Sequence, residues 1–351
     1  MPDEPEKKIR VVIVTPALAD ANNGNWQTAK RWAGFLAPMM DVRLCKEWPD
    51  ADLAADDAQA DRVMIALHAR RAATSIARWH EVHGERGLGV VLTGTDLYRD
   101  IGHDTSAQRS LVLAHTLVVL QERGPDALPD AARRKARVIF QSTPTRAPMA
   151  KPLLPLRVVT VGHLREEKSP QTLFAAARLL ADHAQIRIDH IGVALDPALG
   201  EAARQAMRDA PNYRWLGGLS HDATRRRIQR AHLLVHPSRM EGGAHVIMEA
   251  VTSGTPVLAS RVDGNVGMLG AHYDGYFEWN DAATVAARMV ECAHELRSRS
   301  TDAAETTGPR DPHAGLLARL RSQCEQRAGL FAPAAERRAV RQLVADLAKG
   351  Y

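Results

Sequence analysis

Residues 237–257 read PSRMEGGAHVIMEAVTSGTPV, and this stretch decides the fold of the second half of the chain. An apolar run ends just before Pro237, a Gly-rich loop and a helical pattern follow, and Gly254-Thr255-Pro256 marks a turn. The order predicts a strand, a loop, a helix, a tight turn and a further strand. That succession is one βαβ passage of a parallel sheet.

The same stretch carries two carboxylates that suit a ligand with a charged centre and hydroxyls at both ends. Glu241 lies in the loop and Glu249 in the expected helix, and each can accept hydrogen bonds from sugar hydroxyls. The glycines allow close backbone approach, and a helix start offers free N–H groups to a diphosphate. A nucleotide sugar has this layout. The alternative is that both are solvated acids at a helix start, but the flanking strand and turn signals favour a ligand site.

A second motif occupies residues 158–170, which read VVTVGHLREEKSP. An apolar run that ends at Gly162 and continues into Arg165 and Lys168 predicts a strand opening into an anion-binding loop. Isolated, the two cations would be ordinary surface charge. Together with the downstream glutamates they indicate a diphosphate clamp.

Both motifs resemble those of the retaining group 1 glycosyltransferases of the GT-B fold, which carry a Glu-x7-Glu pair and a Gly-Arg-Leu-x-x-x-Lys loop. The resemblance implies a catalytic set and a donor-binding set, the latter including the residue that holds the ribose hydroxyls, Glu249. The catalytic residues are Glu241, Arg165 and Lys168, and the donor-binding residues are Gly162, His163, Gly243, Ala244, His245, Val246 and Glu249. His163 stands where the family usually has arginine, so one cation is weakened.

The bulk composition is that of an ordinary globular protein of 351 residues, with 45% hydrophobic and 25% charged residues. The net charge of +5 is spread along the chain and aromatic residues make up only 5%, which speaks against a nucleic-acid surface. None of the three cysteines, Cys45, Cys292 and Cys324, stands in a CxxC pair, so neither a disulfide framework nor a structural zinc site is expected.

The sequence predicts no targeting signal, membrane span or metal site. The charged start, residues 1–10, has no apolar core of a signal peptide, and no run of about 18 apolar residues predicts a membrane span. We therefore expect a cytoplasmic protein. No Asp-x-Asp or His-rich metal motif is found, so we expect neither a metal nor another cofactor, the UDP-sugar being a substrate. The oligomeric state is left open.

Apolar runs alternate with helical patterns along the whole chain and predict parallel, doubly wound sheets. The expected strands are 11–14, 42–44, 62–68, 89–92, 116–120 and 137–140, then 157–161, 187–191, 213–215, 233–236 and 256–260. The fold class is thus α/β, and the resemblance implies two GT-B domains facing across a cleft.

Three segments follow from this division: an acceptor-side domain over residues 1–150, a nucleotide-sugar domain over 151–297, and a C-terminal part over 298–351. A proline-rich stretch from Ser142 to Leu156 suggests the hinge. Residues 298–315 are expected to be a flexible loop, and the tail from 316 to 349 to be helical with a break near Pro333. In GT-B proteins such helices cross back onto the first domain.

The acceptor half resembles one subgroup of the family. The segments 67–71 (LHARR), 93–98 (TGTDLY) and 264–270 (GNVGMLG) are similar to the selenosugar synthases of selenoneine biosynthesis, over a range from about residue 11 to about residue 278. The usual Pro-Glu of the wider family is replaced here by Val266-Gly267. The resemblance implies transfer of a sugar from UDP-N-acetylglucosamine or UDP-glucose to selenophosphate, with release of UDP and phosphate.

The candidate acceptor-binding residues follow the carboxyl ends of the expected strands, where ligands bind in such sheets. They are Gly24, Asn25, His68, Arg70, Arg71, Thr95, Asp96 and Asn265. Several alternatives stay open. Arg70 and Arg71 are also compatible with a solvated helix start, His68 with a strand-end residue satisfied by backbone, and Asp96 with a cap.

Two other functions share the donor motif: transfer to a small alcohol, thiol or lipid head group, and non-catalytic binding of a nucleotide sugar. The presence of Arg165, Lys168, Glu241 and Glu249 together speaks against a decayed site. The sequence leaves open which sugar is transferred, and whether the configuration at the anomeric carbon is retained or inverted.

Overall fold

The computed structural model describes residues 8–18, 24–50, 58–305 and 315–349, with the side chains of 300–305 left out. The chain forms two compact units, Met1–Ser142 with Pro333–Tyr351, and Thr143–Ala332. Each unit is built on a six-stranded sheet whose neighbouring strands all run parallel. The predicted pair of doubly wound α/β domains is therefore confirmed.

The sheet of the first unit has the strand order β2-β1-β3-β4-β5-β6, so the order reverses between β1 and β3. β3 and β4 are buried along their whole length, which explains their unbroken apolar sequences. The strands are β1 (Arg10–Val14), β2 (Asp41–Cys45), β3 (Val63–Leu67), β4 (Leu88–Leu92), β5 (Thr116–Val119) and β6 (Ala136–Val138).

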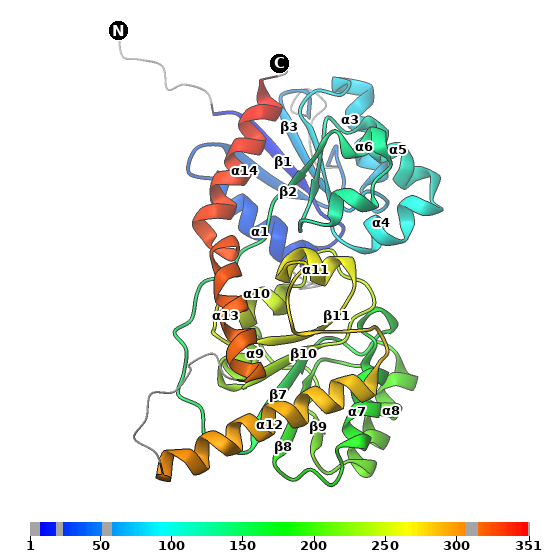
Figure 1. The fold of residues 1–351 in the computed structure, drawn as a ribbon. Helices are drawn as coiled ribbons and strands as arrows, with labels where there is room; N and C mark the ends of the chain where they lie inside the picture. The colour runs from blue at the N-terminus through cyan, green and yellow to red at the C-terminus, as the bar shows by residue number, and fades with distance from the viewer. Residues whose placement is uncertain (1–7, 19–23, 51–57, 306–314, 350–351) are drawn as a thin grey trace. The chain divides into compact units, whose positions relative to one another are not determined.

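Helices cover both faces of this sheet, because alternate strand residues point to opposite sides. Val11 and Ile13 pack in the cluster that includes Trp32 of α1 and Leu343 of α14, whereas Val12 and Val14 pack in the cluster of α3 and α5. Figure 1 shows α1 and α14 on one side of the sheet and α3 and α5 on the other. The helices are α1 (Gly24–Leu36), α3 (Ala73–His83), α4 (Thr95–Tyr98), α5 (Thr105–Leu113), α6 (Asp130–Arg133) and α14 (Pro333–Ala348).

The second unit has the order β12-β11-β10-β7-β8-β9, which reverses between β7 and β10. Its strands are β7 (Leu156–Val161), β8 (Ile186–Ile191), β9 (Tyr213–Trp215), β10 (Leu233–His236), β11 (Val257–Ser260) and β12 (Tyr276–Phe277). Its helices are α7 (Pro170–Leu179), α8 (Pro197–Asp209), α9 (His221–Arg230), α10 (His245–Val251), α11 (Asp263–Leu269), α12 (Ala282–Glu305) and α13 (Leu316–Ala328). α12 and α8 pack on α7, and α10 contacts α9 and α13.

The helical tail breaks where the sequence predicts it. α13 ends at Ala328, a short 3-10 turn covers Gly329–Phe331, and α14 begins at Pro333, because proline is tolerated at the first helical position. α14 packs against α1 and β3 of the first unit. The prediction that the C-terminal helical part crosses back to the first domain is thus confirmed.

One expectation about this region is wrong. Residues 298–305 were expected to belong to a loop, but α12 continues through them to Glu305. Arg299 pairs with Glu295 one helical turn earlier at 2.7 Å, and Ala303, Ala304 and Glu305 are good helix formers. The rest of the expected loop, residues 306–314, lies outside the described residues.

The proline-rich stretch after Ser142 is held by the second unit. Arg225 of α9 donates to Thr143 Oγ1 at 2.7 Å and to the Pro144 carbonyl at 2.8 Å, and Gln229 donates to the Ala147 carbonyl at 2.6 Å. The compact units divide between Ser142 and Thr143. The domain boundaries at residues 150 and 297 stay predictions.

A buried carboxylate fastens α14 within the first unit. Glu336, only 1% exposed, accepts hydrogen bonds from Arg31 Nε at 2.7 Å, Trp32 Nε1 at 2.6 Å and the Ser142 amide at 2.8 Å. Arg31 Nη2 and Ser142 Oγ also donate to it. α1, α14 and the end of the first chain segment are therefore joined at one charged group.

We expect Glu336→Gln to lower the free energy of unfolding of the first unit by about 3 kcal/mol, because it leaves Arg31 without its buried counter-charge. Urea unfolding followed by circular dichroism measures the change. Glu325→Gln, an exposed position on α13, is the matched control and should leave stability unchanged. Equal midpoints for the two variants would contradict this role of Glu336.

Candidate functional site

The reversal of strand order between β7 and β10 marks where a ligand site is expected in the second unit. Loops that leave neighbouring strands on opposite sides of a sheet open a crevice at the carboxyl ends of those strands. The segment after β7 carries Gly162, His163, Arg165 and Lys168, and the segment after β10 carries Glu241. Both sequence motifs therefore follow the two strands that flank the reversal.

The two segments meet at the carboxylate of Glu241, which is 8% exposed. Lys168 Nζ lies 2.5 Å from Glu241 Oε1, and His236 Nε2 lies 3.0 Å from the same oxygen. His236 is the last residue of β10 and is 1% exposed. One carboxylate oxygen thus accepts from a cation of the β7 loop and from an imidazole of β10.

Electrostatics hold this carboxylate in its charged form. Burial by itself raises the pKa of Glu241, but the charge of Lys168 and the hydrogen bonds from Lys168 and His236 outweigh it and hold the pKa well below its usual range. Burial also lowers the pKa of His236, against the opposing effect of Glu241. Near neutral pH the carboxylate of Glu241 is therefore charged and the imidazole of His236 is neutral.

Further contacts lock the two loops together. The Arg239 amide donates to the Glu167 carbonyl at 3.0 Å, and the Arg239 side chain pairs with Glu166 at 2.7 Å. Gly264 of α11 lies so close to Glu241 that a Cβ atom there would stand 1.9 Å from the Glu241 carbonyl oxygen. Only glycine allows α11 to pack against this loop.

Glu249 lies on α10 and is 5% exposed. Its Oε1 atom is 2.6 Å from Nε2 of His221, the first residue of α9, whose side chain is 72% exposed. The hydrogen bond to Glu249 raises the pKa of His221. An exposed imidazole thus covers a buried carboxylate at the start of α9.

The other predicted donor residues differ in what they offer. Among the described residues Arg165 has no hydrogen-bond partner for its buried Nε atom, and its nearest acid, Glu167, is 4.0 Å away. Burial, with help from Arg165 and Lys168, lowers the pKa of His163, so this residue is neutral where arginine would be charged. Gly162, Gly243 and His245 are half-buried and Val246 is buried, and the Ala244 amide donates to Met268 Sδ at 3.0 Å.

Most of the predicted acceptor residues follow β1, β3 and β4 of the first unit, next to the reversal of its strand order. Gly24 and Asn25 begin α1, and the preceding residues 19–23 lie outside the described residues. His68 directly follows β3 with a φ of 79°, a left-handed conformation that is uncommon for residues other than glycine. Thr95, the first residue of α4, follows β4 and lies 3.1 Å from His68 Nε2 through its hydroxyl.

Asp96 lies within α4 and accepts hydrogen bonds from backbone amides that precede this helix. Its Oδ1 atom accepts from the Thr93 and Gly94 amides, each at 2.9 Å, and its Oδ2 atom accepts from the Ala69 amide at 2.9 Å. The side chain is fully buried. Asp96 therefore joins the loops after β3 and β4 through their backbones.

Arg70 and Arg71, the basic residues that follow His68, use different atoms in their hydrogen bonds. The Arg71 amide donates to His68 Nδ1 at 3.3 Å, while the Arg71 side chain is exposed. Arg70 Nε donates to Asp100 at 2.8 Å. Burial raises the pKa of Asp100, but hydrogen bonds from Arg70 and Arg99 outweigh it and the net pKa is lowered. Burial lowers the pKa of His68.

Asn265 lies in the second unit and is fully buried. Its Nδ2 atom donates to the Ser260 carbonyl at 2.9 Å and contacts the Ser260 hydroxyl at 3.0 Å. It thereby ties the start of α11 to the end of β11. Its predicted contact with an acceptor stays a prediction.

Sequence reasoning missed three residues that the fold brings to these sites: His236, His221 and Asp100. The signal for His236 was available, since it immediately precedes the Pro237-Ser238 pair at the end of an expected strand. His221 is 28 positions from Glu249 in sequence, and no pattern joins the two.

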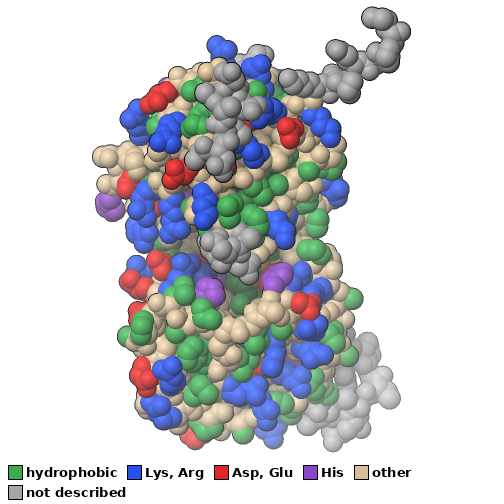
Figure 2. All heavy atoms as spheres, turned by 180° about the vertical axis from the view of Figure 1, so that it is seen from behind, with side chains coloured by type: hydrophobic (Ala, Val, Ile, Leu, Met, Phe, Trp, Pro, Cys, Tyr) green, Lys and Arg blue, Asp and Glu red, His purple; other side chains and the backbone are tan. Residues whose placement is uncertain are grey.

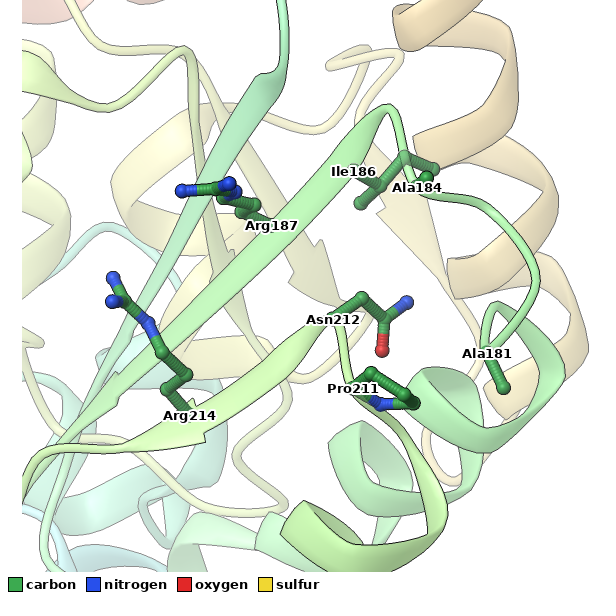
Figure 3. A pocket seen from close by; sticks show the side chains of 7 residues that line it. All are labelled: Ala181, Ala184, Ile186, Arg187, Pro211, Asn212 and Arg214. Carbon is green, nitrogen blue, oxygen red and sulfur yellow. The ribbon is translucent and has the colours of Figure 1, made fainter.

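A pocket of about 420 Å³ opens elsewhere in the second unit, at the amino ends of β8 and β9 (Figure 3). Its lining residues are Ala181, Ala184, Ile186, Arg187, Pro211, Asn212 and Arg214. In Figure 3 the guanidinium groups of Arg187 and Arg214 point away from Asn212. Because ligands of such sheets bind at the carboxyl ends of strands, this pocket is not the candidate site.

Surface and cofactor features add little. On the face drawn in Figure 2, Lys and Arg side chains are interspersed with acidic and apolar ones. Within the described ranges no three His, Cys, Asp or Glu side chains are placed to share a metal ion. Among the helices of those ranges, none is both long and apolar enough to span a bilayer.

Comparison with known proteins finds a family match over the second unit. Residues 143–306 match the family model described as glycosyl transferases group 1. A curated relative, the gpi3 subunit of phosphatidylinositol N-acetylglucosaminyltransferase from Schizosaccharomyces pombe, is 28% identical over 134 residues. That match covers 38% of this chain and 28% of the relative, so the chain spans under a third of the length of the curated relative.

Solved structures show the same fold. Sucrose-phosphate synthase from Thermosynechococcus elongatus superposes with a TM-score of 0.71 at 16% identity, covering 98% of this chain and all of that one. Anabaena HepE, solved with UDP and glucose, gives 0.64 at 13% identity, covering 96% and 100%. Staphylococcus aureus TarM, solved with UDP, gives 0.61 at 14% identity and covers 83% of this chain and 55% of that chain. The GT-B fold is therefore shown.

A buried histidine beside the β7 loop makes stability depend on pH. His190 of β8 is 2% exposed, bonds the Tyr213 hydroxyl at 2.9 Å and donates to the Gly162 carbonyl. Burial lowers the pKa of His190 from 6.5 to about 4. The folded protein therefore keeps the neutral form, while the unfolded chain takes up a proton below about pH 6.5.

We expect this group alone to cost about 2 kcal/mol of stability between pH 7 and pH 5, because stability is complete above the unfolded pKa and falls toward the folded one. Urea unfolding at pH 7, 6 and 5 measures it. His190→Asn should flatten this dependence, whereas the exposed His294→Asn should not. Parallel pH profiles of wild type and His190→Asn would contradict the assignment.

Proposed function

We propose, from the premise that residues 143–306 form a group 1 glycosyltransferase domain of the GT-B fold, that the protein transfers a sugar from a UDP-sugar to selenophosphate. One observation carries the donor half of the proposal. Lys168, His236 and Glu241 converge at the carboxyl ends of β7 and β10, where a sheet of this topology binds its ligand. HepE and TarM, which share the fold, were solved with UDP.

Each donor residue has a role that its surroundings support. Glu249, buried on α10, holds the ribose hydroxyls, and His221 is its partner in the free protein. Arg165 and Lys168 neutralise the charge that grows on the leaving diphosphate, which is the main electrostatic contribution to catalysis. Glu241 and the backbone of residues 243–246 hold the transferred sugar.

The low pKa of Glu241 restricts its chemistry. A carboxyl group held in the charged form cannot donate a proton to the leaving diphosphate near neutral pH. It can accept hydrogen bonds from sugar hydroxyls and orient Lys168. Leaving-group departure then rests on the cations of the β7 loop, and the proposal needs no metal ion.

The acceptor half rests on the resemblance of residues 67–71, 93–98 and 264–270 to the selenosugar synthases. Selenium of selenophosphate attacks the anomeric carbon, a C–Se bond forms, the C–O bond to the diphosphate breaks, and UDP leaves. Water then attacks phosphorus, the P–Se bond breaks, and phosphate and the selenosugar result. A selenium nucleophile is soft and largely ionised, so it needs placement more than a general base.

Positive groups of the first unit supply that placement in the proposal. The exposed side chain of Arg71 and the amides at the start of α1 near Gly24 and Asn25 receive the phosphate group. Arg70 contributes less, because Asp100 already neutralises it. His68 and Thr95 form a hydrogen-bonded pair, and His68 also contacts the Arg71 amide.

A second candidate keeps the donor site and changes the acceptor to a small alcohol, thiol or lipid head group. The curated relative is named a phosphatidylinositol N-acetylglucosaminyltransferase subunit, which favours this candidate over a non-catalytic binding module. A non-catalytic nucleotide-sugar-binding module is the third candidate, and it predicts donor binding without turnover.

The purified protein is incubated with UDP-N-acetylglucosamine or UDP-glucose, with and without freshly prepared selenophosphate, and products are identified by mass spectrometry. We expect UDP and a selenium-bearing hexose only when selenophosphate is present. UDP binding without a selenium product would replace selenophosphate by another acceptor. The absence of both would overturn the donor site as well.

Replacing Lys168 by Ala should lower kcat about a hundredfold, because one of the two cations facing the leaving group is lost. Circular dichroism should show a folded protein of lower stability, since Glu241 loses its ion pair but keeps His236 as a hydrogen-bond partner. Arg178→Ala, which removes an exposed cation of α7 paired with Asp209, is the matched control and should keep normal turnover. Normal turnover by Lys168→Ala with unchanged donor affinity would remove Lys168 from the mechanism.

A further inference from the structure

Both side chains that hydrogen-bond to the carboxylate of Glu241 approach the same oxygen. Lys168 Nζ at 2.5 Å and His236 Nε2 at 3.0 Å both approach Oε1, and no hydrogen bond to Oε2 is found among the described residues. A carboxylate offers about four acceptor positions on its two oxygens. Glu241 can therefore accept further hydrogen bonds at Oε2.

The two partners of Oε1 differ in mobility. Lys168 has a flexible side chain that is 20% exposed, and a diphosphate would compete with Glu241 for its charge. His236 is 1% exposed and its backbone lies within the sheet, paired with Ala259 of β11. When Lys168 turns toward a ligand, only His236 continues to hold the carboxylate.

The protonation of His236 fits that task. Glu241 is charged and can only accept, so the hydrogen of this contact belongs to Nε2 of the imidazole. The backbone of Glu241 is fixed in addition by Gly264, whose Cα lies in van der Waals contact with it. The main chain and one oxygen are thus both restrained.

We propose that His236 is a positioning residue that holds Oε1 of Glu241, so that Oε2 faces the transferred sugar while Lys168 is released to the diphosphate. This inference rests on the proposed function and deepens it. It assigns recognition of the sugar, as distinct from the nucleoside diphosphate, to a histidine that makes no contact with the donor.

The test separates affinity for UDP from affinity for the UDP-sugar. Dissociation constants of UDP and of UDP-N-acetylglucosamine or UDP-glucose are measured by calorimetry for wild type, His236→Leu and His236→Gln. We expect His236→Leu to bind UDP within about twofold of wild type but to lose about tenfold in affinity for the UDP-sugar. His236→Gln, which keeps a donor of similar reach, should recover most of that loss.

Two further variants complete the design. His232→Leu removes the buried histidine at the other end of β10, whose partners are the Arg157 amide and the Pro152 carbonyl. It should lower the melting temperature and leave the ratio of the two affinities unchanged. Lys168→Ala should weaken UDP itself, which distinguishes the diphosphate contact from the sugar contact.

The outcomes are distinct. If folded His236→Leu shows the wild-type ratio, the inference is wrong while the donor site stands. If His236→Leu does not fold, His236→Asn, whose amide is too short to reach Oε1, takes its place against His236→Gln, and equal ratios for that pair overturn the inference. Failure of wild type to bind UDP overturns the proposed function and this inference with it.

Discussion

The Lys168–Glu241 ion pair is the constraint on which the rest of the second unit depends. A carboxylate that is 8% exposed is stable only when its charge is compensated, so the β7 loop and the β10 loop must meet. The approach of the two loops is also supported by the contacts of Arg239 with Glu166 and Glu167, and by the glycine at position 264. The reversal of strand order between β7 and β10 gives the two loops room to approach.

Buried acids elsewhere in the described residues show what distinguishes this one. Both oxygens of Asp96 are occupied by backbone amides, and Glu336 accepts five hydrogen bonds from α1 and the end of the first segment. In these two carboxylates both oxygens are engaged by groups of the protein itself. Glu241 is also buried, at 8% exposure, but both of its hydrogen bonds from side chains reach one oxygen, as we expect of a group that binds a ligand with the other.

Much of the fold was predictable because its signals are local. Apolar runs of four to six residues recur along the chain, and eleven of the twelve strands were expected from them. The strand β12 has only two residues and is too short to show a pattern. The polar composition of residues 298–305 predicts a loop, but helix-forming residues and the Arg299–Glu295 ion pair extend α12 to Glu305. Composition alone does not separate a polar helix from a loop.

The sequence by itself determined the α/β class and the two loops that carry Lys168 and Glu241, and it predicts the kind of ligand that these residues suit. The spacing of the motif residues along the chain was sufficient to place these loops, because the residues follow strand ends whose direction is fixed in a parallel sheet. Only the tertiary structure decided that His236 and Lys168 share one oxygen of Glu241, and that His221 covers Glu249. Those pairs join residues up to 73 positions apart, and their contact depends on packing distances that no linear pattern encodes.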